Sequence, residues 1–100
     1  MNRIAFFTDQ AKQDLAESRD WYEAEVDGLG YDLVDEVRKA VNRVESNAEQ
    51  FAIEHRDARI CPVKRFPFLV VFRIKGQQVE ILALMHGHRD PKAWMKRIDH

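Results

Sequence analysis

The fold of this chain is decided by the stretch Phe68-Leu69-Val70-Val71-Phe72-Arg73-Ile74, Lys75-Gly76-Gln77-Gln78, Val79-Glu80-Ile81-Leu82-Ala83-Leu84-Met85. It consists of two segments rich in β-branched and aromatic residues, separated by a turn that contains glycine, which is typical of an antiparallel β-hairpin. Successive side chains of a strand point to opposite faces. We therefore expect one face to pack in the core and to carry Phe68, Val70, Phe72, Ile74, Val79, Ile81, Ala83 and Met85.

The opposite face of this predicted hairpin is also partly apolar, with Leu69, Val71, Leu82 and Leu84. A sheet with one solvated face normally alternates apolar with polar residues more cleanly, so something should cover this face. One candidate is a short final helix, which Asp90 can cap and Pro91 can begin, and whose apolar side carries Trp94, Met95 and Ile98. Such a helix is too short to cover the whole face. A partner chain, dimerisation or core packing can each account for the remainder.

The first half of the chain has the period of two helices. A short apolar run from Ile4 to Phe7 predicts a strand, and Thr8 can cap a helix after it. The first helix has an apolar stripe and ends at the glycines of residues 27–30; the stripe is Ala11, Leu15, Tyr22 and Val26. A second helix ends near Asn47 and carries the stripe Leu33, Val34, Val37, Val41 and Val44. The short connection predicts an antiparallel helical hairpin.

The segment between the helices and the β-hairpin is less regular. Residues 48–58 have no clear period, so we expect a connecting loop. Residues 59–65 predict a weak strand at a sheet edge, because Pro62 has no backbone N–H to donate. The predicted fold is therefore α+β, with an N-terminal strand, an antiparallel helical hairpin, an antiparallel sheet of three further strands and a short C-terminal helix.

Length and composition limit the classes of protein. A chain of 100 residues with 45% hydrophobic content suits a single domain over residues 1–100. The apolar segment near the N-terminus is too short for a signal peptide, and no apolar run approaches the roughly 20 residues that span a bilayer. We therefore expect a cytoplasmic protein without a membrane partner. Cys61 is the only cysteine, which excludes an intrachain disulfide and the zinc sites that need paired cysteines. We predict neither a metal nor another cofactor.

Charge is divided along the chain. Residues 1–58 hold 7 Lys/Arg against 14 Asp/Glu, whereas residues 59–100 hold 9 against 3. A basic face in the second half would attract phosphate backbones or acidic protein partners. There, His86 and His88 can exchange protons near neutral pH, and phosphate can be bound by Arg65, Arg73, Arg89 and Arg97. The histidines can equally be polar surface, and the arginines can equally form surface ion pairs.

The order of the predicted elements and several motifs resemble the RelE/ParE family of bacterial type II toxins. The motifs are Ala11-x-x-Asp14-Leu15, Trp21-Tyr22, Arg65-Phe66-Pro67-Phe68, His86-x-x-Arg89 and Pro91-x-x-Trp94. The resemblance spans nearly the whole chain and implies a plasmid-stabilisation toxin that arrests growth. It also implies a cognate antitoxin that wraps and neutralises the toxin in a hetero-oligomer, with a toxin dimer as the other assembly. We expect the antitoxin to bind the second sheet face at Leu69, Val71, Leu82, Leu84 and Trp94.

The family divides into two branches with different targets. The RelE branch resembles a metal-independent endoribonuclease that cuts messenger RNA at the ribosome, and its catalytic residues here would be His86, Arg89 and Arg65. The ParE branch is similar in fold but poisons DNA gyrase without known catalysis of its own, and its target-binding residues here would be Arg65, Arg73, His88, Arg89 and Arg97. The RelE branch usually has arginine at the start of the central strand, where this chain has Pro67 and Phe68. The sequence therefore predicts inhibition of gyrase, with RelE-like cleavage of messenger RNA as the alternative.

Overall fold

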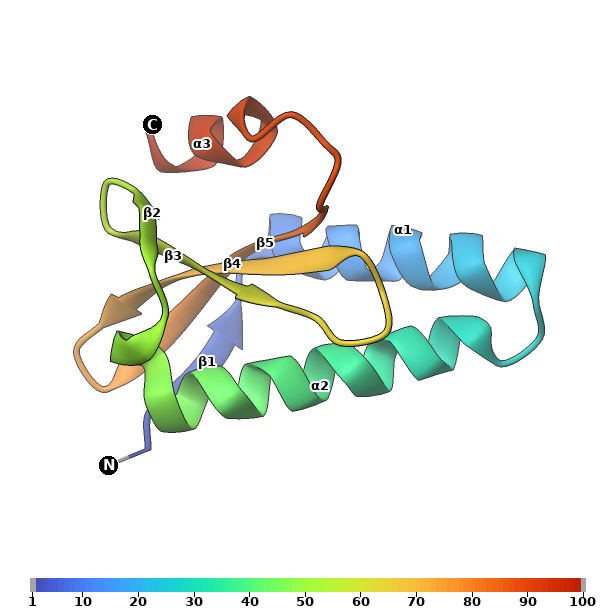
Figure 1. Ribbon diagram of the computed structural model, residues 1–100, viewed down its shortest axis with the longest axis horizontal. Coiled ribbons are helices and arrows are strands. Elements are labelled where there is room, and N and C mark those ends of the chain that lie inside the picture. The colour runs from blue at the N-terminus through green and yellow to red at the C-terminus, as the bar shows by residue number, and fades with distance from the viewer. Residues whose placement is uncertain (1, 100) are drawn as a thin grey trace.

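The computed structural model describes residues 2–99, and its elements follow the predicted order with one added strand. Two long antiparallel helices lie on one side of a five-stranded sheet, and a short C-terminal helix lies on the other (Figure 1). The helices are α1 (Asp9–Glu25), α2 (Leu29–Asn47) and α3 (Lys92–Ile98), with a 3₁₀ turn η1 (Ala48–Gln50). The strands are β1 (Ile4–Phe7), β2 (Ile53–His55), β3 (Ala58–Pro62), β4 (Phe68–Lys75) and β5 (Gln78–His86). The predicted α+β fold is confirmed.

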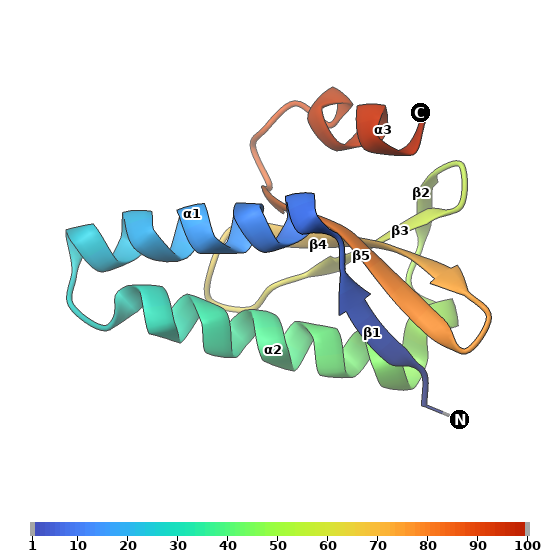
Figure 2. The same cartoon turned by 180° about the vertical axis from the view of Figure 1, so that it is seen from behind.

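The strand order is β1-β5-β4-β3-β2, with β1 parallel to β5 and the other neighbours antiparallel. Figure 2 shows β1 at one edge of the sheet, where it leads into α1. At the other edge β2 pairs with β3, so the prediction of a loop over residues 48–58 is wrong. A strand of three residues is too short to show a period in the sequence. The predicted edge strand over residues 59–65 spans Ala58–Pro62, and its last three residues, Ile60, Cys61 and Pro62, extend beyond the pairing with β2.

Polar groups at the helix ends explain how the helical hairpin forms. The Thr8 hydroxyl accepts a hydrogen bond from the N–H of Ala11 (3.1 Å), as predicted for an N-cap. Between the helices, Gly28 has a φ of 85°, a left-handed conformation that glycine adopts without strain. The Glu23 carboxylate of α1 accepts from the N–H groups of Gly28 (2.7 Å) and Gly30 (3.0 Å). Glu23 therefore satisfies donors that would otherwise lack partners at the start of α2.

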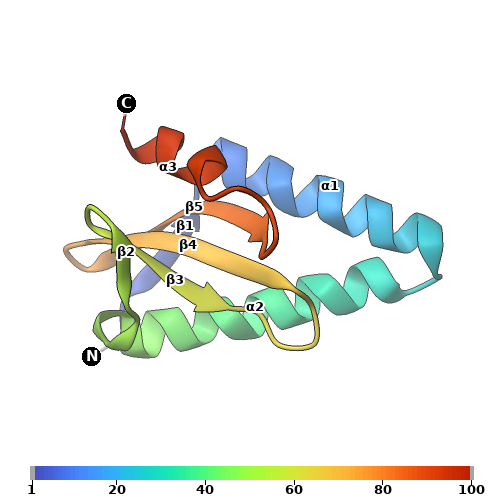
Figure 3. The same cartoon turned by 45° about the horizontal axis from the view of Figure 1, so that its top comes forward.

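The main core lies between the helical hairpin and the sheet. Figure 3 shows the tip of the hairpin formed by α1 and α2 projecting beyond the sheet. Val26, predicted to belong to the apolar stripe of the first helix, follows the end of α1 and is 56% exposed. The centre of this core contains Leu33, Val37, Val44, Val70, Phe72, Val79 and Ile81.

A β-bulge changes which face the last residues of β5 occupy. The register between β4 and β5 shifts by one residue at Val71 and Phe72. Because one extra residue reverses the alternation of side chains, Leu84 packs in the main core, whereas Ala83 and Met85 pack on the opposite face. The predicted faces of these three β5 residues are therefore wrong.

Helix α3 covers much of the second sheet face. Its Trp94 is 4% exposed and packs in a smaller core cluster with Ala58, Val71, Leu82, Ala83 and Met85. The helix begins at Lys92, one residue later than predicted, with Pro91 rather than Asp90 at the N-cap position. The Asp90 carboxylate, one residue before, still accepts from the N–H of Lys92 (3.0 Å). The chain's own packing therefore covers much of the second sheet face, for which a partner chain was one of the predicted alternatives.

The far end of α3 is held by polar contacts with the turn between β2 and β3. Asp99, directly after the helix, accepts hydrogen bonds from Arg56 Nε (2.6 Å) and from His55 Nε2 (2.9 Å). These two hydrogen bonds hold the pKa of the Asp99 carboxyl below its ordinary value. The helix is therefore attached both through Trp94 and through the charge of Asp99.

Candidate functional site

The predicted histidine and arginine cluster lies at the end of β5 and in the turn before α3. His86 is half-buried, and its ring meets Phe68 edge-on with 5.4 Å between ring centroids. Its Nδ1 accepts a hydrogen bond from the backbone N–H of His88 (3.2 Å), and the two imidazole centroids are 5.3 Å apart. Arg89 is exposed beside them, and its N–H donates to the His86 carbonyl (3.0 Å). The structure therefore brings His86, His88 and Arg89 together.

Arg65 adjoins this cluster through its backbone but directs its side chain elsewhere. The Gly87 N–H donates to the Pro67 carbonyl (2.7 Å), so the loop between β3 and β4 lies against the end of β5. The guanidinium of Arg65 pairs with Glu36 (3.4 Å) and Asp32 (3.7 Å) of α2. Since Glu36 is only 5% exposed, Arg65 compensates a carboxylate that the fold has largely removed from water.

Arg97 has its partners inside the molecule. Its guanidinium makes two hydrogen bonds to Asp14 of α1 (2.7 and 3.0 Å) and one to the Leu82 carbonyl (2.9 Å). The Asp14 carboxylate also accepts from the N–H of Leu84 (3.0 Å). The pairing of β1 with β5 ends at Ile81, so Asp14 and Arg97 satisfy the backbone of β5 where its neighbouring strand has ended. Arg97 thereby joins α3 to α1 and β5.

Arg73 lies away from the histidines, toward the turn of the β-hairpin. It is opposite Glu80 in the ladder, whereas His86 is opposite Phe68 at the other end. Its Nε lies 3.7 Å from Glu80 and 3.8 Å from Asp57, which form ion pairs with it. The structure therefore does not bring Arg73 to the cluster of His86, His88 and Arg89.

Most residues of the predicted antitoxin surface are buried within the chain. Val71 and Leu82 pack under α3 against its own Trp94, and Leu84 packs in the main core on the other side of the sheet. Leu69 is half-buried and lines a small cavity of about 130 Å³ beside α3. A partner could reach Leu69 in this arrangement, but it could reach Val71 and Leu82 only if α3 moved.

An open apolar groove follows the junction of β1, α1 and α2. Two adjoining hollows, with volumes of about 410 and 180 Å³, share the lining residues Phe7, Leu15 and Val34. Their basic lining residues are Lys12, Arg19 and Arg38. The sequence did not reveal this groove, because Leu15 and Val34 have the same period as fully buried core residues.

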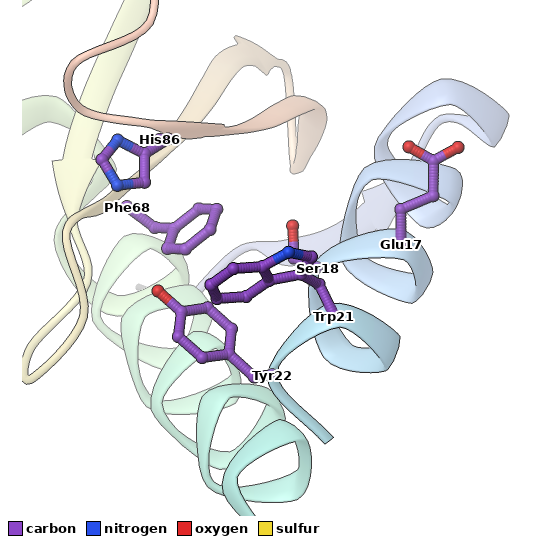
Figure 4. A pocket seen from close by; sticks show the side chains of 6 residues that line it. All are labelled: Glu17, Ser18, Trp21, Tyr22, Phe68 and His86. Carbon is purple, nitrogen blue, oxygen red and sulfur yellow. The ribbon is translucent and has the colours of Figure 1, made fainter. Parts of the chain in front are cut away.

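An aromatic pocket of about 390 Å³ lies between α1 and the His86 end of the sheet (Figure 4). Trp21 in this pocket is 60% exposed, although tryptophan is highly buried on average. His86 lines this pocket and also the small cavity beside α3, so it separates the two. The residues around the aromatic pocket are Glu17, Ser18, Trp21, Tyr22, Phe68 and His86.

Sequence reasoning missed the acidic residues that organise these surfaces. Asp14 directly precedes Leu15, and Glu36 directly precedes Val37, so each carboxylate lies beside the apolar stripe of its helix. A carboxylate in that position is a signal of a partner inside the fold, because burying an unpaired charge is costly. Glu17 gave no such signal, since it shares the solvated face of α1 with other charged residues.

Other chemistry is limited in the part of the chain that the structure describes. Within residues 2–99, no group of three or more His, Cys, Asp or Glu side chains is arranged to hold a metal ion. In the same range, no helix combines the length and the apolar character needed to cross a membrane. Burial raises the pKa of the Cys61 thiol, which makes a reactive thiolate less accessible.

Comparison with known proteins places these features in context. The family described as "ParE toxin of type II toxin-antitoxin system, parDE" matches residues 5–91. A solved structure described as "Chromosomal ParDE TA system from P. aeruginosa" has 26% identity and a TM-score of 0.72, covering 84% of this chain and 95% of that one. The toxin–antitoxin complex RelBE2 from Mycobacterium tuberculosis is similar in fold alone, with 18% identity, a TM-score of 0.58 and coverage of 86% and 99%. No curated protein matches the chain.

Proposed function

This chain belongs to the ParE toxin family of type II toxin–antitoxin systems, and from that premise we propose that it arrests growth by binding and inhibiting DNA gyrase. A cognate antitoxin neutralises it, in the manner suggested by the similar structure whose description names a ParDE system. In this proposal the chain acts as a binding module rather than as a nuclease.

The observation that carries the proposal is the arrangement of the arginines. Cleavage of RNA through the 2'-hydroxyl needs a base, an acid and cations that stabilise the pentavalent phosphate. Arg65 is paired with Glu36 and Asp32, and Arg97 is paired with Asp14. Of the residues predicted for a nuclease, His86, Arg89 and Arg65, these contacts favour a structural role for Arg65, which counts against cleavage. The same contacts leave His88 and Arg89, rather than Arg65 and Arg97, for the contact with gyrase.

The exposed surface at the end of β5 is the proposed contact with gyrase. His88 and Arg89 are both exposed there, and the chain around them, residues 59–100, has an excess of basic residues. A basic surface steers association with an acidic surface or with DNA held by an enzyme. Arg89 is the residue whose removal should weaken target binding most, because its side chain is exposed and charged at all physiological pH values.

The apolar groove of β1, α1 and α2 is the proposed contact with the antitoxin. It offers apolar area without displacement of α3, whereas the second sheet face is largely covered by Trp94. An amphipathic helix can place its apolar side in such a groove. Acidic residues on the flanks of that helix would face Lys12, Arg19 and Arg38.

Induction of the chain in bacteria without an antitoxin tests the proposal. We expect DNA synthesis to stop while messenger RNA stays intact. Arg89→Ala should relieve the arrest, whereas Lys92→Ala, a neighbouring exposed basic residue, should relieve it less. The measurements are incorporation of labelled thymidine and the integrity of several messenger RNAs in the same cultures.

Two outcomes contradict the proposal. Rapid cleavage of messenger RNA with continued DNA synthesis would favour the RelE-like activity. Growth that is unaffected by a soluble, folded chain would exclude both toxic activities for this protein.

A further inference from the structure

The aromatic pocket between α1 and the end of β5 has a chemistry that the proposed function does not use. The rings of Trp21 and Tyr22 are nearly perpendicular (89°), with centroids 5.0 Å apart, and those of Tyr22 and Phe68 meet at 64° and 6.1 Å. Figure 4 shows these rings gathered at the pocket, with the imidazole of His86 beyond Phe68. The negative face of an aromatic ring attracts a cation. Rings at steep angles can therefore enclose a positive group from more than one side.

Charge on α1 favours the same kind of occupant. Glu17 precedes Trp21 by four residues, so both side chains lie on one face of the helix. Its carboxylate accepts a hydrogen bond from Gln13 Nε2 (2.9 Å). Helix α1 has six Asp/Glu against two Lys/Arg, although Asp14 and Asp20 are paired with arginines. Its last turn has no basic residue to offset the partial negative charge of that helix end. Both the fixed charges and the helix end thus attract a cation to this region.

The shape of the pocket and its donors and acceptors distinguish among cations. A guanidinium group is planar, stacks on aromatic faces and donates two parallel hydrogen bonds to a carboxylate. The pocket, with a volume of about 390 Å³, is lined by aromatic rings and by Glu17. Figure 4 shows the Glu17 carboxylate directed away from the rings, so this exposed side chain has to rotate to meet a guanidinium stacked on Trp21. An ammonium group is not planar, so it cannot donate two parallel hydrogen bonds to a carboxylate while it stacks on a ring.

A nucleotide is the main competing occupant, because a base can also stack on an exposed indole. Nucleotides carry phosphate, however, and phosphate needs cationic or N–H partners. Among the described residues that line the pocket there is neither lysine nor arginine, and the charged residue there is Glu17. The charge of the pocket therefore opposes a nucleotide.

We propose that this pocket binds an arginine side chain of a partner protein. The guanidinium stacks on Trp21 and donates hydrogen bonds to the Glu17 carboxylate. Exposed tryptophan is common among the residues that dominate the energy of protein interfaces, which agrees with the 60% exposure of Trp21. Binding of an arginine side chain in this pocket does not depend on gyrase being the target of the protein.

Nuclear magnetic resonance of the full chain can test this directly, with N-acetyl-arginine methylamide as the probe. The indole N–H signal of Trp21 should move in a saturable way, whereas that of Trp94, which is 4% exposed, should stay in place. The uncharged N-acetyl-norleucine methylamide should leave Trp21 unchanged. Glu17→Gln should weaken binding of the arginine probe about fivefold. Glu25→Gln, an exposed position of α1 outside the pocket, is its matched control.

A second variant separates the ring from the charge. Trp21→Ala, followed through the backbone signals of Ser18 and Tyr22, should weaken binding of the arginine probe about tenfold. Tyr31→Ala removes another exposed aromatic ring (63% exposed) that does not line the pocket, and it should bind as the parent chain does. Both positions are exposed, so neither change should prevent folding.

Three results would overturn the proposal. The first is a Trp21 signal that stays in place up to the solubility limit of the arginine probe. The second is an equal response to the norleucine probe, which would indicate apolar contact alone. The third is a response to guanosine monophosphate in the absence of a response to the arginine probe, which would assign the pocket to a nucleotide.

Discussion

Replacing Asp14 with alanine should lower the free energy of unfolding by about 3 kcal/mol and the melting temperature by about 15 °C. The reason is that one carboxylate accepts three hydrogen bonds: two from the Arg97 guanidinium and one from the N–H of Leu84 (3.0 Å). The side chains of Arg97 and Asp14 are only 18% and 14% exposed, so water would not fully replace the lost partner. Because both side chains keep some exposure, the loss of unfolding free energy should lie at the lower end of the range for broken buried ion pairs.

Thermal unfolding of Asp14→Ala and Asp20→Ala measures this effect against a control. Asp20 lies on the same helix and pairs with Arg19, but its side chain is 70% exposed, so its loss should cost less than about 1 kcal/mol. Asp14→Asn should fall between them, because an amide keeps an acceptor for Leu84 but loses the charge that binds Arg97. Equal melting temperatures for Asp14→Ala and Asp20→Ala would show that the contact of α1 with β5 and α3 is not important for stability.

Gly30→Ala should lower the free energy of unfolding by about 2 kcal/mol, the opposite of what helix propensity alone predicts. In an exposed helix interior this change would stabilise by about 1 kcal/mol. Here a Cβ atom at position 30 would clash with the carbonyl oxygen of Arg19 and lie 3.0 Å from Cβ of Glu23. Both contacts belong to α1, so the two helices would have to separate near the tip of their hairpin. Glu23 would then lose its hydrogen bonds to the start of α2.

Gly87→Ala is the control for this prediction. A Cβ atom there would lie 3.5 Å from the Pro67 carbonyl oxygen, an ordinary contact, so the change should alter stability by less than about 0.5 kcal/mol. Chemical denaturation of both variants gives the two free energies under the same conditions. A Gly30→Ala chain as stable as the parent would mean that the helices are not as close in solution as they are in this structure.

Local patterns were sufficient to predict most of the fold. The strand at residues 4–7, the cap at Thr8 and the end of the second helix at Asn47 agree with the structure, because each depends on residues close together in the sequence. The bulge in β5 could not be predicted, since its cause lies in the pairing with β4 and not in the alternation of β5 itself. Leu84 was consequently assigned to the wrong face.

The candidate site was predictable only in part, because some of its contacts join residues that are far apart in the sequence. His86, His88 and Arg89 are neighbours in the sequence, and they remain neighbours in the structure. The partner of Arg97 is 83 residues away in the sequence, and a paired arginine has the same sequence pattern as a free one. Likewise, Trp21 and Phe68 form one pocket only because α1 packs beside the sheet. Long-range contacts decide which charges are available for function.

Supercoiling by purified gyrase measures the proposed inhibition by this ParE-family chain without other components of the cell. Relaxed plasmid, ATP and gyrase should yield little supercoiled product when the chain is added in excess, and supercoiling should return when the chain is first mixed with its cognate antitoxin. Arg89→Ala should inhibit less than Lys92→Ala at the same concentration. Full supercoiling in the presence of the folded chain, together with cleavage of messenger RNA by that preparation on translating ribosomes, would contradict the account.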